Sequence, residues 1–505
     1  SNEGNLQIGK EYVILYDGVG TLQMQGAVSV SSNTPGRVQF LNVGGDNIFF
    51  NLTTSQLGDH VRNVRVLRLE DEGADIVNHP FYEGYLEKIA PFTAIRFMDW
   101  GATNNNPVVT WDERVPVTFR TYGMEQGVPY EVMIQLANYA KKHVWVCVPH
   151  LADENYIREM AQLFRDNLDP ELTIYLEYSN EVWNWLFEQA HYNADNAPSN
   201  LNYGRAYAER ARRIFQFWFE EFGAESDRIR RVLGIQGGFN YLNEQIMSQI
   251  PGDEWDYGWP TWYFGLNHGA TGNPVLNASS TAQDVVANAT NAWLGFKPLV
   301  KQDYNNVKVF GKGIVNYEGG QHFTDFSVPP YIQAMYDAQY TQEIYDLYNS
   351  VLDTIRSWRS ELPFAFSLAG VQESIYGSWG HVSDIDTPEP YLTTAPKYQA
   401  LLDNLCPPDC PYLIFLSNAS PITTATHHAS GKVVAYGTVP NGNNVIMRAG
   451  NHVELSAGFE AAVGAEVLLE IEECGGSFAP PVPPAEEKKS TQKVEGKEGN
   501  QLREE

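Results

Sequence analysis

Apolar and polar residues alternate in short runs over the first 60 positions, the pattern of β-strands. The clearest runs are Tyr12–Tyr16, Val38–Val43 and Ile48–Leu52, and Gly and Asn residues separate them. Short alternating runs between turn-forming residues are typical of small β-structures. We therefore expect residues 1–60 to form a β-sandwich-like N-terminal module.

From about residue 61 short apolar runs alternate with amphipathic helical segments. Strands are expected at 64–69, 94–97, 144–148, 173–178, 232–236, 261–264, 313–316 and 364–368. Helices are expected at 130–142, 155–167, 203–222, 282–299, 331–359 and 396–404. Eight strands alternating with helices predict an α/β fold, a (β/α)8 TIM barrel over residues 61–405. A doubly wound open sheet is the competing architecture, and it is disfavoured because no glycine-rich phosphate loop follows the first strand.

The segment 406–474 returns to short β-like runs with polar turns, which predicts a small stacked or sandwich β module. The last segment, 475–505, carries Pro480-Pro481 and Pro483-Pro484 and then a Lys/Glu-rich stretch. Such composition is typical of a disordered tail or linker.

The chain has four cysteines. Cys147 lies in an apolar run and is expected to be a buried thiol. The other three flank the C-terminal module, and a disulfide bond among them, most simply Cys410–Cys474 or Cys406–Cys410, would fit an oxidising compartment.

Charge and composition exclude several classes of partner. The formal net charge is −28, which argues against nucleic acids and anionic membranes because proteins bind both through Lys and Arg. No apolar stretch approaches the roughly 18 residues of a membrane span. No His/Cys cluster has the spacing of zinc ligands, so neither a metal nor a cofactor is expected. Aromatic residues make up 13% of the chain, which fits a carbohydrate binder as well as a large aromatic core.

Two glutamates each end an apolar, strand-like run. Glu181 follows the run that starts at Thr173, and Glu318 follows the run that starts at Gly313. A lone Asn-Glu pair is usually a solvated turn, but this one is framed by a strand and by aromatic residues. Catalytic groups of a (β/α)8 barrel lie at the C-terminal ends of its strands, here the fourth and the seventh. Glycoside hydrolysis needs a general acid and a second carboxylate at the anomeric carbon, so the pair predicts a glycosidase.

The strand-four Asn180-Glu181 and the strand-seven Glu318 resemble the clan A glycoside hydrolases, the superfamily that includes the family 5 cellulases and mannanases. Four more positions agree with that group: an Arg at the second strand, a His ending the third, a Tyr ending the sixth and a Trp after the eighth. They are Arg96, His150, Tyr263 and Trp379.

The resemblance implies a role for each residue. Glu181 would be the general acid and then the base, and Glu318 the nucleophile of a retaining reaction. Asn180 would bond the sugar 2-hydroxyl, and Arg96 would keep Glu318 ionised. The remaining substrate-binding candidates are His150, Tyr263, Trp379, Trp183 and Trp100, and buried structural roles stay open for Arg96, His150 and the three tryptophans.

Two further carboxylates bear on this site. Glu177 lies four residues before Glu181, so in a strand the two share a face, and Glu177 is expected to point into the barrel. Glu373, just after the eighth predicted strand, is a rival carboxylate that lacks the glycine-framed turn of Glu318.

The expected function is a retaining endo-β-glycanase that hydrolyses β-1,4-linked glucan of the cellulose type or a related hemicellulose. The alternatives are a xylanase, mannanase or exo-β-glycosidase of the same clan, or a non-catalytic glycan-binding surface protein. The segment 449–460 is similar to the C-terminal β modules of exported Bacteroidetes-type surface proteins. That similarity, in a chain that starts without an initiator Met or a signal peptide, predicts a mature extracellular or cell-surface protein.

Overall fold

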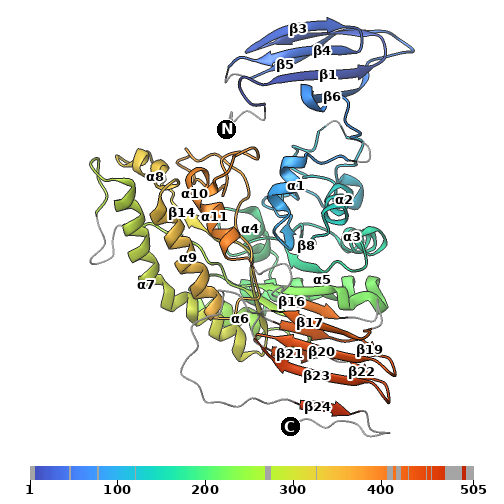
Figure 1. Cartoon of the computed structure of the whole chain (residues 1–505), viewed down its shortest axis with the longest axis vertical. Coiled ribbons are helices and arrows are strands. Elements are labelled where there is room, and N and C mark those ends of the chain that lie inside the picture. The colour runs from blue at the N-terminus through green and yellow to red at the C-terminus, as the bar shows by residue number, and fades with distance from the viewer. Residues whose placement is uncertain are drawn as a thin grey trace. The chain divides into compact units, whose positions relative to one another are not determined.

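The computed structural model of the 505-residue chain describes residues 6–44, 47–76, 79–119, 121–267, 275–325, 327–405, 413–416, 422–429, 432–450, 452–456, 458–472 and 492–495. The chain divides into two compact units, Ser1–Leu86 and Glu87–Glu505. In Figure 1 the first lies at the blue end of the colour range, and the second runs from lighter blue through green and yellow to red.

The N-terminal unit is antiparallel. One sheet has the order β3-β4-β1-β6, from β1 (Glu11–Asp17), β3 (Val28–Thr34), β4 (Arg37–Asn42) and β6 (Arg62–Arg68). A second ribbon pairs β2 (Gly20–Gln25) with β5 (Phe49–Ser55). Alternate residues of a strand share a face, and one face of β1 and β4 builds the core with residues Tyr12, Ile14, Tyr16, Leu22, Val38 and Phe40.

The strand expected at 64–69 does not open a barrel. It is β6, which pairs with β1 in antiparallel register, Ile14 opposite Val66. The reason is that β1 is a central strand: β4 satisfies one of its hydrogen-bonding edges, and its other edge needs a partner. The N-terminal unit therefore takes a strand that the apolar pattern assigned to the barrel.

The second unit contains a seven-stranded parallel sheet. Its strands are β7 (Ala94–Arg96), β8 (His143–Val148), β9 (Ile174–Tyr178), β10 (Ile229–Gly234), β11 (Tyr257–Trp259), β13 (Gly313–Asn316) and β15 (Leu362–Pro363). The order in space equals the order in the chain. A doubly wound sheet reverses its order at a switch point, and this sheet does not. The sixth and eighth predicted strands lie earlier than expected, at 257–259 and 362–363, and Pro260, which has no N–H to donate, follows β11 directly.

The sheet curls around an interior of side chains. Four strands separate β7 from β13, which would place them about 24 Å apart in a flat sheet. Yet Arg96 Nη1 of β7 lies 2.6 Å from Glu318 Oε1, just after β13. Trp145 of β8 also meets Phe364, just after β15, with ring centroids 5.1 Å apart. In the described residues no hydrogen-bonded pairing joins β15 to β7, so a closed eight-stranded barrel stays a prediction.

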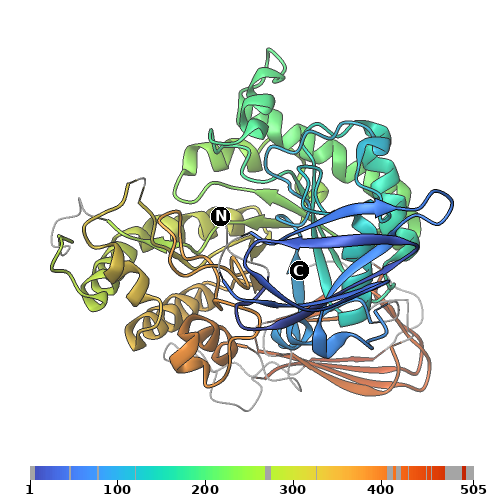
Figure 2. The same cartoon turned by 90° about the horizontal axis from the view of Figure 1, so that it is seen from above.

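Helices alternate with these strands and lie around them in Figure 2. They are α1 (Glu83–Ile89), α2 (Tyr130–Ala140), α3 (Glu154–Asn167), α4 (Glu188–Asp195), α5 (Tyr203–Phe222), α6 (Asn240–Met247), α7 (Ala282–Val309), α8 (Ile332–Ala338), α9 (Gln342–Ser357), α10 (Tyr391–Thr394) and α11 (Pro396–Asp403). The single helix expected at 331–359 is two, because Thr341 caps the N-terminus of α9 by accepting from Ile344 N.

The C-terminal strands form stacked parallel coils, drawn in orange to red in Figure 1. Three parallel ladders alternate along the chain: β16 (Leu413–Leu416), β18 (Lys432–Ala435) and β21 (His452–Leu455); β17 (Ala425–Ala429), β20 (Asn444–Ala449) and β23 (Glu466–Ile471); β19 (Thr438–Val439) and β22 (Glu460–Ala461). Small apolar residues fill the interior, among them Ala429, Val433, Val445 and Val467. Of the two architectures expected for this module, the parallel pairing is that of stacked coils, not of a sandwich.

A strand lies in the described part, residues 492–495, of the segment expected to be a disordered tail. β24 (Gln492–Glu495) pairs antiparallel with β23, which would otherwise be the edge of its ladder. Unpaired edge groups favour the addition of such a strand. Cys406, Cys410 and Cys474 lie outside the described residues, so their pairing stays a prediction, and Cys147 is a buried free thiol as expected. No helix in the described part of the chain is long and apolar enough to cross a membrane.

Candidate active site

Glu181 lies in a tight turn just after β9. Ser179 and Glu181 both have positive φ angles, 53° and 40°. Residues other than Gly rarely adopt this backbone conformation, and where they do it is often at a functional site. Asn184 closes the turn: its backbone N–H donates to Glu181 O at 2.8 Å, and its Nδ2 donates to Glu181 Oε2 at 2.9 Å. The turn therefore holds a half-buried carboxylate at the C-terminal end of the strand.

Glu318 lies just after β13, and its carboxylate is anchored at both oxygens. Arg96 Nη1 donates to Oε1 at 2.6 Å, and the Tyr263 hydroxyl donates to Oε2 at 2.7 Å. The following Gly319 is required here, because a Cβ at that position would lie 2.2 Å from the Trp262 ring. The backbone can thus turn closely past Trp262 and leave Glu318 aimed at Arg96.

Arg96 connects three side chains of the site. Besides Glu318, its Nη2 donates to Glu177 Oε2 at 2.9 Å and to Asn180 Oδ1 at 2.8 Å. Asn180 in turn donates through Nδ2 to Asn104 Oδ1 at 3.1 Å. One guanidinium therefore fixes the nucleophile candidate, the Asn beside the acid candidate and a buried carboxylate.

Glu177 points into the interior of the sheet, as its two-residue period with Glu181 predicts. It is fully buried, and its Oε2 accepts from Trp145 Nε1 at 2.8 Å and from Cys147 Sγ at 3.3 Å as well as from Arg96. Burial raises the pKa of Glu177, and the Arg96 charge opposes that rise. Glu177 and Glu318 thus share a single positive charge.

The electrostatics of Glu318 follow from this sharing. The pKa of Glu318 is raised to about 7, and burial is the largest cause. The Arg96 charge and the Tyr263 hydroxyl oppose this rise, and the neighbouring Glu181 charge adds to it. Burial alone would lower the pKa of Arg96, but Glu177 and Glu318 raise it well above the ordinary value. Arg96 therefore stays charged and does act in the expected direction on Glu318, but burial outweighs it.

Tyr317 links the two ends of the site. Its hydroxyl donates to Glu181 Oε1, and it is the residue directly before Glu318. Its ring packs on Trp259 with centroids 3.9 Å apart, and the Arg96 guanidinium lies 5.2 Å from the ring centroid. The residue that bonds the acid candidate after β9 is thereby the chain neighbour of the nucleophile candidate after β13.

The two predicted tryptophans Trp379 and Trp183 differ in how they relate to the site. Trp379 is half-buried near Tyr263 and His322, with ring centroids 5.8 and 5.0 Å away, so it packs on the tyrosine that bonds Glu318. Trp183 is only 7% exposed and packs on Trp259 at 5.1 Å, where it supports Tyr317 rather than offering an open ring.

His150 and Trp100 each pack against an aromatic side chain. His150 is buried with its ring edge against Tyr192 at 5.5 Å, and burial lowers its pKa to about 4, so the imidazole is neutral. Trp100 packs on Phe97 in the loop after β7. The rival carboxylate Glu373 is exposed.

Several contacts at the site were not predicted from the sequence. Tyr317 and Asn184 bond Glu181, and Asn104 and Gln189 bond each other and Asn180. Tyr317 directly precedes Glu318 and Asn184 follows Glu181 by three residues, so proximity in sequence could have pointed to both. Asn104 lies in the loop after β7 and Gln189 in the first turn of α4, and neither carries such an indication.

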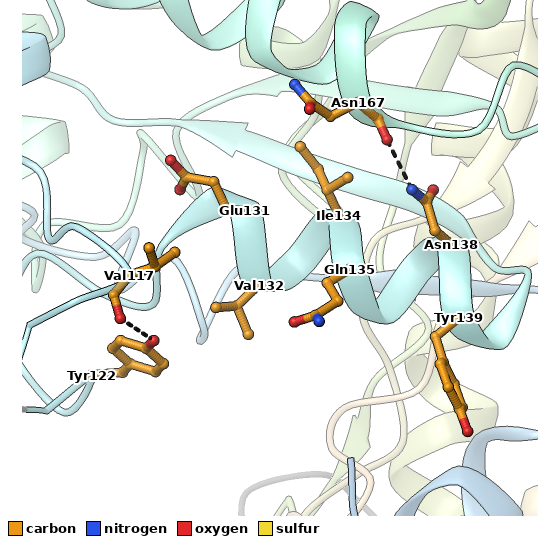
Figure 3. A pocket seen from close by; sticks show the side chains of 9 residues that line it. All are labelled: Val117, Tyr122, Glu131, Val132, Ile134, Gln135, Asn138, Tyr139 and Asn167. Carbon is orange, nitrogen blue, oxygen red and sulfur yellow. Dashed lines mark hydrogen bonds between the residues drawn. The ribbon is translucent and has the colours of Figure 1, made fainter. Parts of the chain in front are cut away.

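A hollow in the surface of the second unit lies away from these residues. It has a volume of about 670 Å³ on the outer face of α2, where Val132, Gln135 and Tyr139 line it together with Val117 and Tyr122 (Figure 3). None of the site residues lines it. Within the described residues no group of three or more His, Cys, Asp and Glu could hold a metal ion.

No protein-family model matches the sequence, and no curated protein does. Several solved structures are similar over part of the fold. A GH51 arabinofuranosidase from Xanthomonas axonopodis pv. citri is 12% identical, with a TM-score of 0.36, over 57% of this chain and 60% of that one. An endo-β-1,4-glucanase from the same organism is 11% identical, with a TM-score of 0.33, over 63% and 89%.

A modular endo-β-1,4-mannanase from Cellulomonas fimi is 14% identical, with a TM-score of 0.31, over 55% of this chain and 57% of that chain. This chain thus spans less than two thirds of the arabinofuranosidase and of the mannanase. Because identities and TM-scores are this low, the functional proposal rests on the geometry of the site itself.

Proposed function

We propose that this chain is a retaining β-glycoside hydrolase, with Glu318 as the nucleophile and Glu181 as the acid and base. The observation that carries the proposal is the double anchoring of Glu318 by Arg96 and Tyr263, next to a second carboxylate held by Tyr317 and Asn184. Two carboxylates in distinct environments at the C-terminal ends of β9 and β13 are the arrangement that glycoside hydrolysis needs.

In the first half-reaction the ionised Glu318 attacks the anomeric carbon and forms an ester bond to the sugar. The bond from that carbon to the glycosidic oxygen breaks, its electron pair stays on the oxygen, and Glu181 gives that oxygen its proton. Arg96 and Tyr263 hold the attacking carboxylate in place, which lowers the entropy cost of reaching the transition state.

In the second half-reaction Glu181, now a carboxylate, takes a proton from water as the water oxygen attacks the anomeric carbon. The ester bond breaks, and its electron pair returns to Glu318. Two displacements at one carbon leave its configuration unchanged, so the product keeps the anomeric configuration of the substrate. Asn180, held by Arg96 and Asn104, is proposed to bond the sugar 2-hydroxyl through both steps.

The proposed substrate is a β-1,4-linked glucan, cleaved within the chain. Aromatic side chains support this substrate: Trp379 packs on Tyr263, which bonds Glu318. Large exposed aromatic residues also follow the strand ends, with Trp185 51%, Phe239 49% and Tyr241 70% exposed. Sugar rings stack on such side chains. The net charge of −28 also favours a neutral polysaccharide. Xylan, mannan and exo-acting cleavage are the alternatives within this reaction class.

The curled sheet of β7 to β15 is proposed to be seven strands of a (β/α)8 barrel. Two observations support this: the strand order follows the chain, and side chains from both ends of the sheet meet in its interior. An extracellular or cell-surface location is proposed because segment 449–460 resembles the C-terminal β modules of exported surface proteins.

The experiment that tests the function is hydrolysis of soluble β-glucans, xylans and mannans by the wild type, Glu181→Gln and Glu318→Gln. Proton NMR follows the first-formed anomer. The proposal expects cleavage of β-glucan, the β-anomer first, and a loss of several orders of magnitude in both variants. Binding without cleavage by the wild type would instead indicate a glycan-binding surface protein, and activity that survives either substitution would contradict the assigned roles.

A further inference from the structure

Tyr317 occupies a fixed position between the two carboxylates. It is only 4% exposed, and its ring is held between Trp259 and the Arg96 guanidinium. Its hydroxyl donates to Glu181 Oε1, while Asn184 Nδ2 donates to the other oxygen. Both oxygens of the acid candidate therefore have a donor from the protein, and the one from Tyr317 comes from a buried, immobilised ring.

The site assigns one tyrosine to each carboxylate. Tyr263 donates to Glu318 Oε2 at 2.7 Å, and Tyr317 donates to Glu181 Oε1. We propose that Tyr317 is a positioning residue for the acid and base Glu181, which deepens the proposed function and rests on it. It holds the carboxyl group at the leaving oxygen and stabilises the carboxylate that remains when the proton has been transferred.

The chemistry of a phenol suits this role. When Glu181 is protonated, the proton on Oε1 must point to the leaving oxygen, and the remaining lone pair of Oε1 still accepts from the Tyr317 hydroxyl, as it does in the ionised form. The amide nitrogen of Asn184 can only donate, so it fits only an oxygen that carries no proton. Tyr317 can therefore keep its contact with Glu181 through both half-reactions, in which that group first loses and then regains a proton.

The consequence is a dependence on the leaving group. Departure of a poor leaving group requires proton transfer from Glu181, so it requires whatever positions Glu181. Departure of 2,4-dinitrophenolate, which is stable without a proton, does not. Loss of the Tyr317 hydroxyl should thus slow the cleavage of poor leaving groups selectively, whereas a general loss of structure would slow all substrates alike.

The test compares kcat/KM of the wild type, Tyr317→Phe and Tyr263→Phe on phenyl and 2,4-dinitrophenyl β-cellobiosides. If the polymer panel identifies another sugar, the same two leaving groups are placed on that sugar. Phe keeps the ring that packs on Trp259 and removes only the oxygen. For Tyr317→Phe we expect kcat/KM to fall about 10-fold or more on the phenyl glycoside and less than about 3-fold on the dinitrophenyl glycoside, as one lost charge-assisted hydrogen bond predicts.

Tyr263→Phe is the matched control, because it removes a phenol from the nucleophile side. It should slow both substrates by similar factors, since Glu318 attacks in both. Equal losses for Tyr317→Phe on the two substrates, or no loss on either, would overturn the inference. Failure of the proposed function is a separate result: Glu318→Gln would then retain activity on the dinitrophenyl glycoside.

Discussion

The guanidinium of Arg96 lies 2.6 Å from the carboxylate of Glu318, although four strands separate β7 from β13 in the sheet. That contact requires the sheet to curl, and it brings the end of β7 into the same site as the ends of β9 and β13. It also sets the charge balance, because Arg96 is shared with the fully buried Glu177. The fold and the electrostatics of the site therefore depend on the same residue.

Replacing Arg96 by Gln should lower activity and narrow its pH range. Arg96 lowers the pKa of Glu318, which burial raises to about 7. Without the guanidinium the nucleophile would ionise at higher pH, so the acidic limb of the kcat/KM profile should move upward, and kcat/KM at its best pH should fall roughly 100-fold. The matched control is Arg114→Gln, which breaks the Arg114–Glu131 ion pair away from the site. An unchanged acidic limb in Arg96→Gln would contradict the assigned role of Arg96.

Glu318→Gln should stabilise the fold at pH 8 while abolishing activity. The pKa of Glu318 is about 7 in the folded chain against an ordinary value of 4.5. Between these values the unfolded chain is ionised while the folded carboxyl holds its proton, so this group lowers stability as the pH rises through that window and keeps the full penalty above it.

The gain for Glu318→Gln at pH 8 should be on the order of 1–3 kcal/mol, or several degrees in Tm, and should shrink toward zero near pH 4.5. Thermal unfolding of both proteins across this pH range measures it. A wild type that is the more stable protein at pH 8 would show that the carboxylate contributes more to folding than its burial costs.

Lys397 should be essential for the loop that carries Trp379. Its fully buried ammonium donates to Gln339 Oε1 and Gln372 Oε1, both at 2.8 Å, and to Ser378 O at 2.7 Å. Lys397→Met leaves three buried acceptors without this donor, so it should cost about 2–4 kcal/mol of unfolding free energy. Because Ser378 directly precedes Trp379, KM should also rise.

The matched control for Lys397 is Lys141→Met. Lys141 is exposed and pairs with Asp169 and Glu171 at the surface. Exposed ion pairs contribute little, so the change should stay within about 1 kcal/mol. Chemical denaturation measures both variants, and similar losses in the two would argue against a special role for the buried ammonium.

Cys147 should be unreactive in the folded protein. It is buried on β8, donates to Glu177, and burial raises the pKa of its thiol well above the ordinary value. Because the thiolate is the reactive form, iodoacetamide should modify Cys147 only after the protein is unfolded in guanidinium chloride. Peptide mass spectrometry distinguishes this cysteine from the other three, and modification of Cys147 under native conditions would contradict its burial.

Local patterns predicted the elements that are local in origin. The helix at 203–222 matches α5, and the apolar runs before Glu181 and Glu318 match β9 and β13. The strand at 64–69 was assigned to the wrong sheet, because pairing with β1 depends on a residue about 50 positions away and not on its own pattern. Period two correctly predicted that Glu177 points inward.

Side-chain contacts between elements that are distant in the chain could not be predicted in the same way. The bond from Tyr317 to Glu181 requires a side-chain direction that no periodicity fixes beyond the end of β13. The burial of Trp183 against Trp259 depends on how the loop after β9 packs against the end of β11. The raised pKa of Glu318 could not be predicted either, because Arg96 also pairs with Glu177, and only the three-dimensional structure shows that pairing.

The most direct test of the central claim is to trap the covalent intermediate. The wild type is incubated with 2,4-dinitrophenyl 2-deoxy-2-fluoro-β-cellobioside, and the modified peptide is identified by mass spectrometry. A mass increase of one fluorinated cellobiosyl group on Glu318, in inactivated enzyme, is the predicted result. Attachment to another carboxylate such as Glu373, or turnover of this substrate with no labelled peptide, would contradict the assignment of Glu318 as the nucleophile.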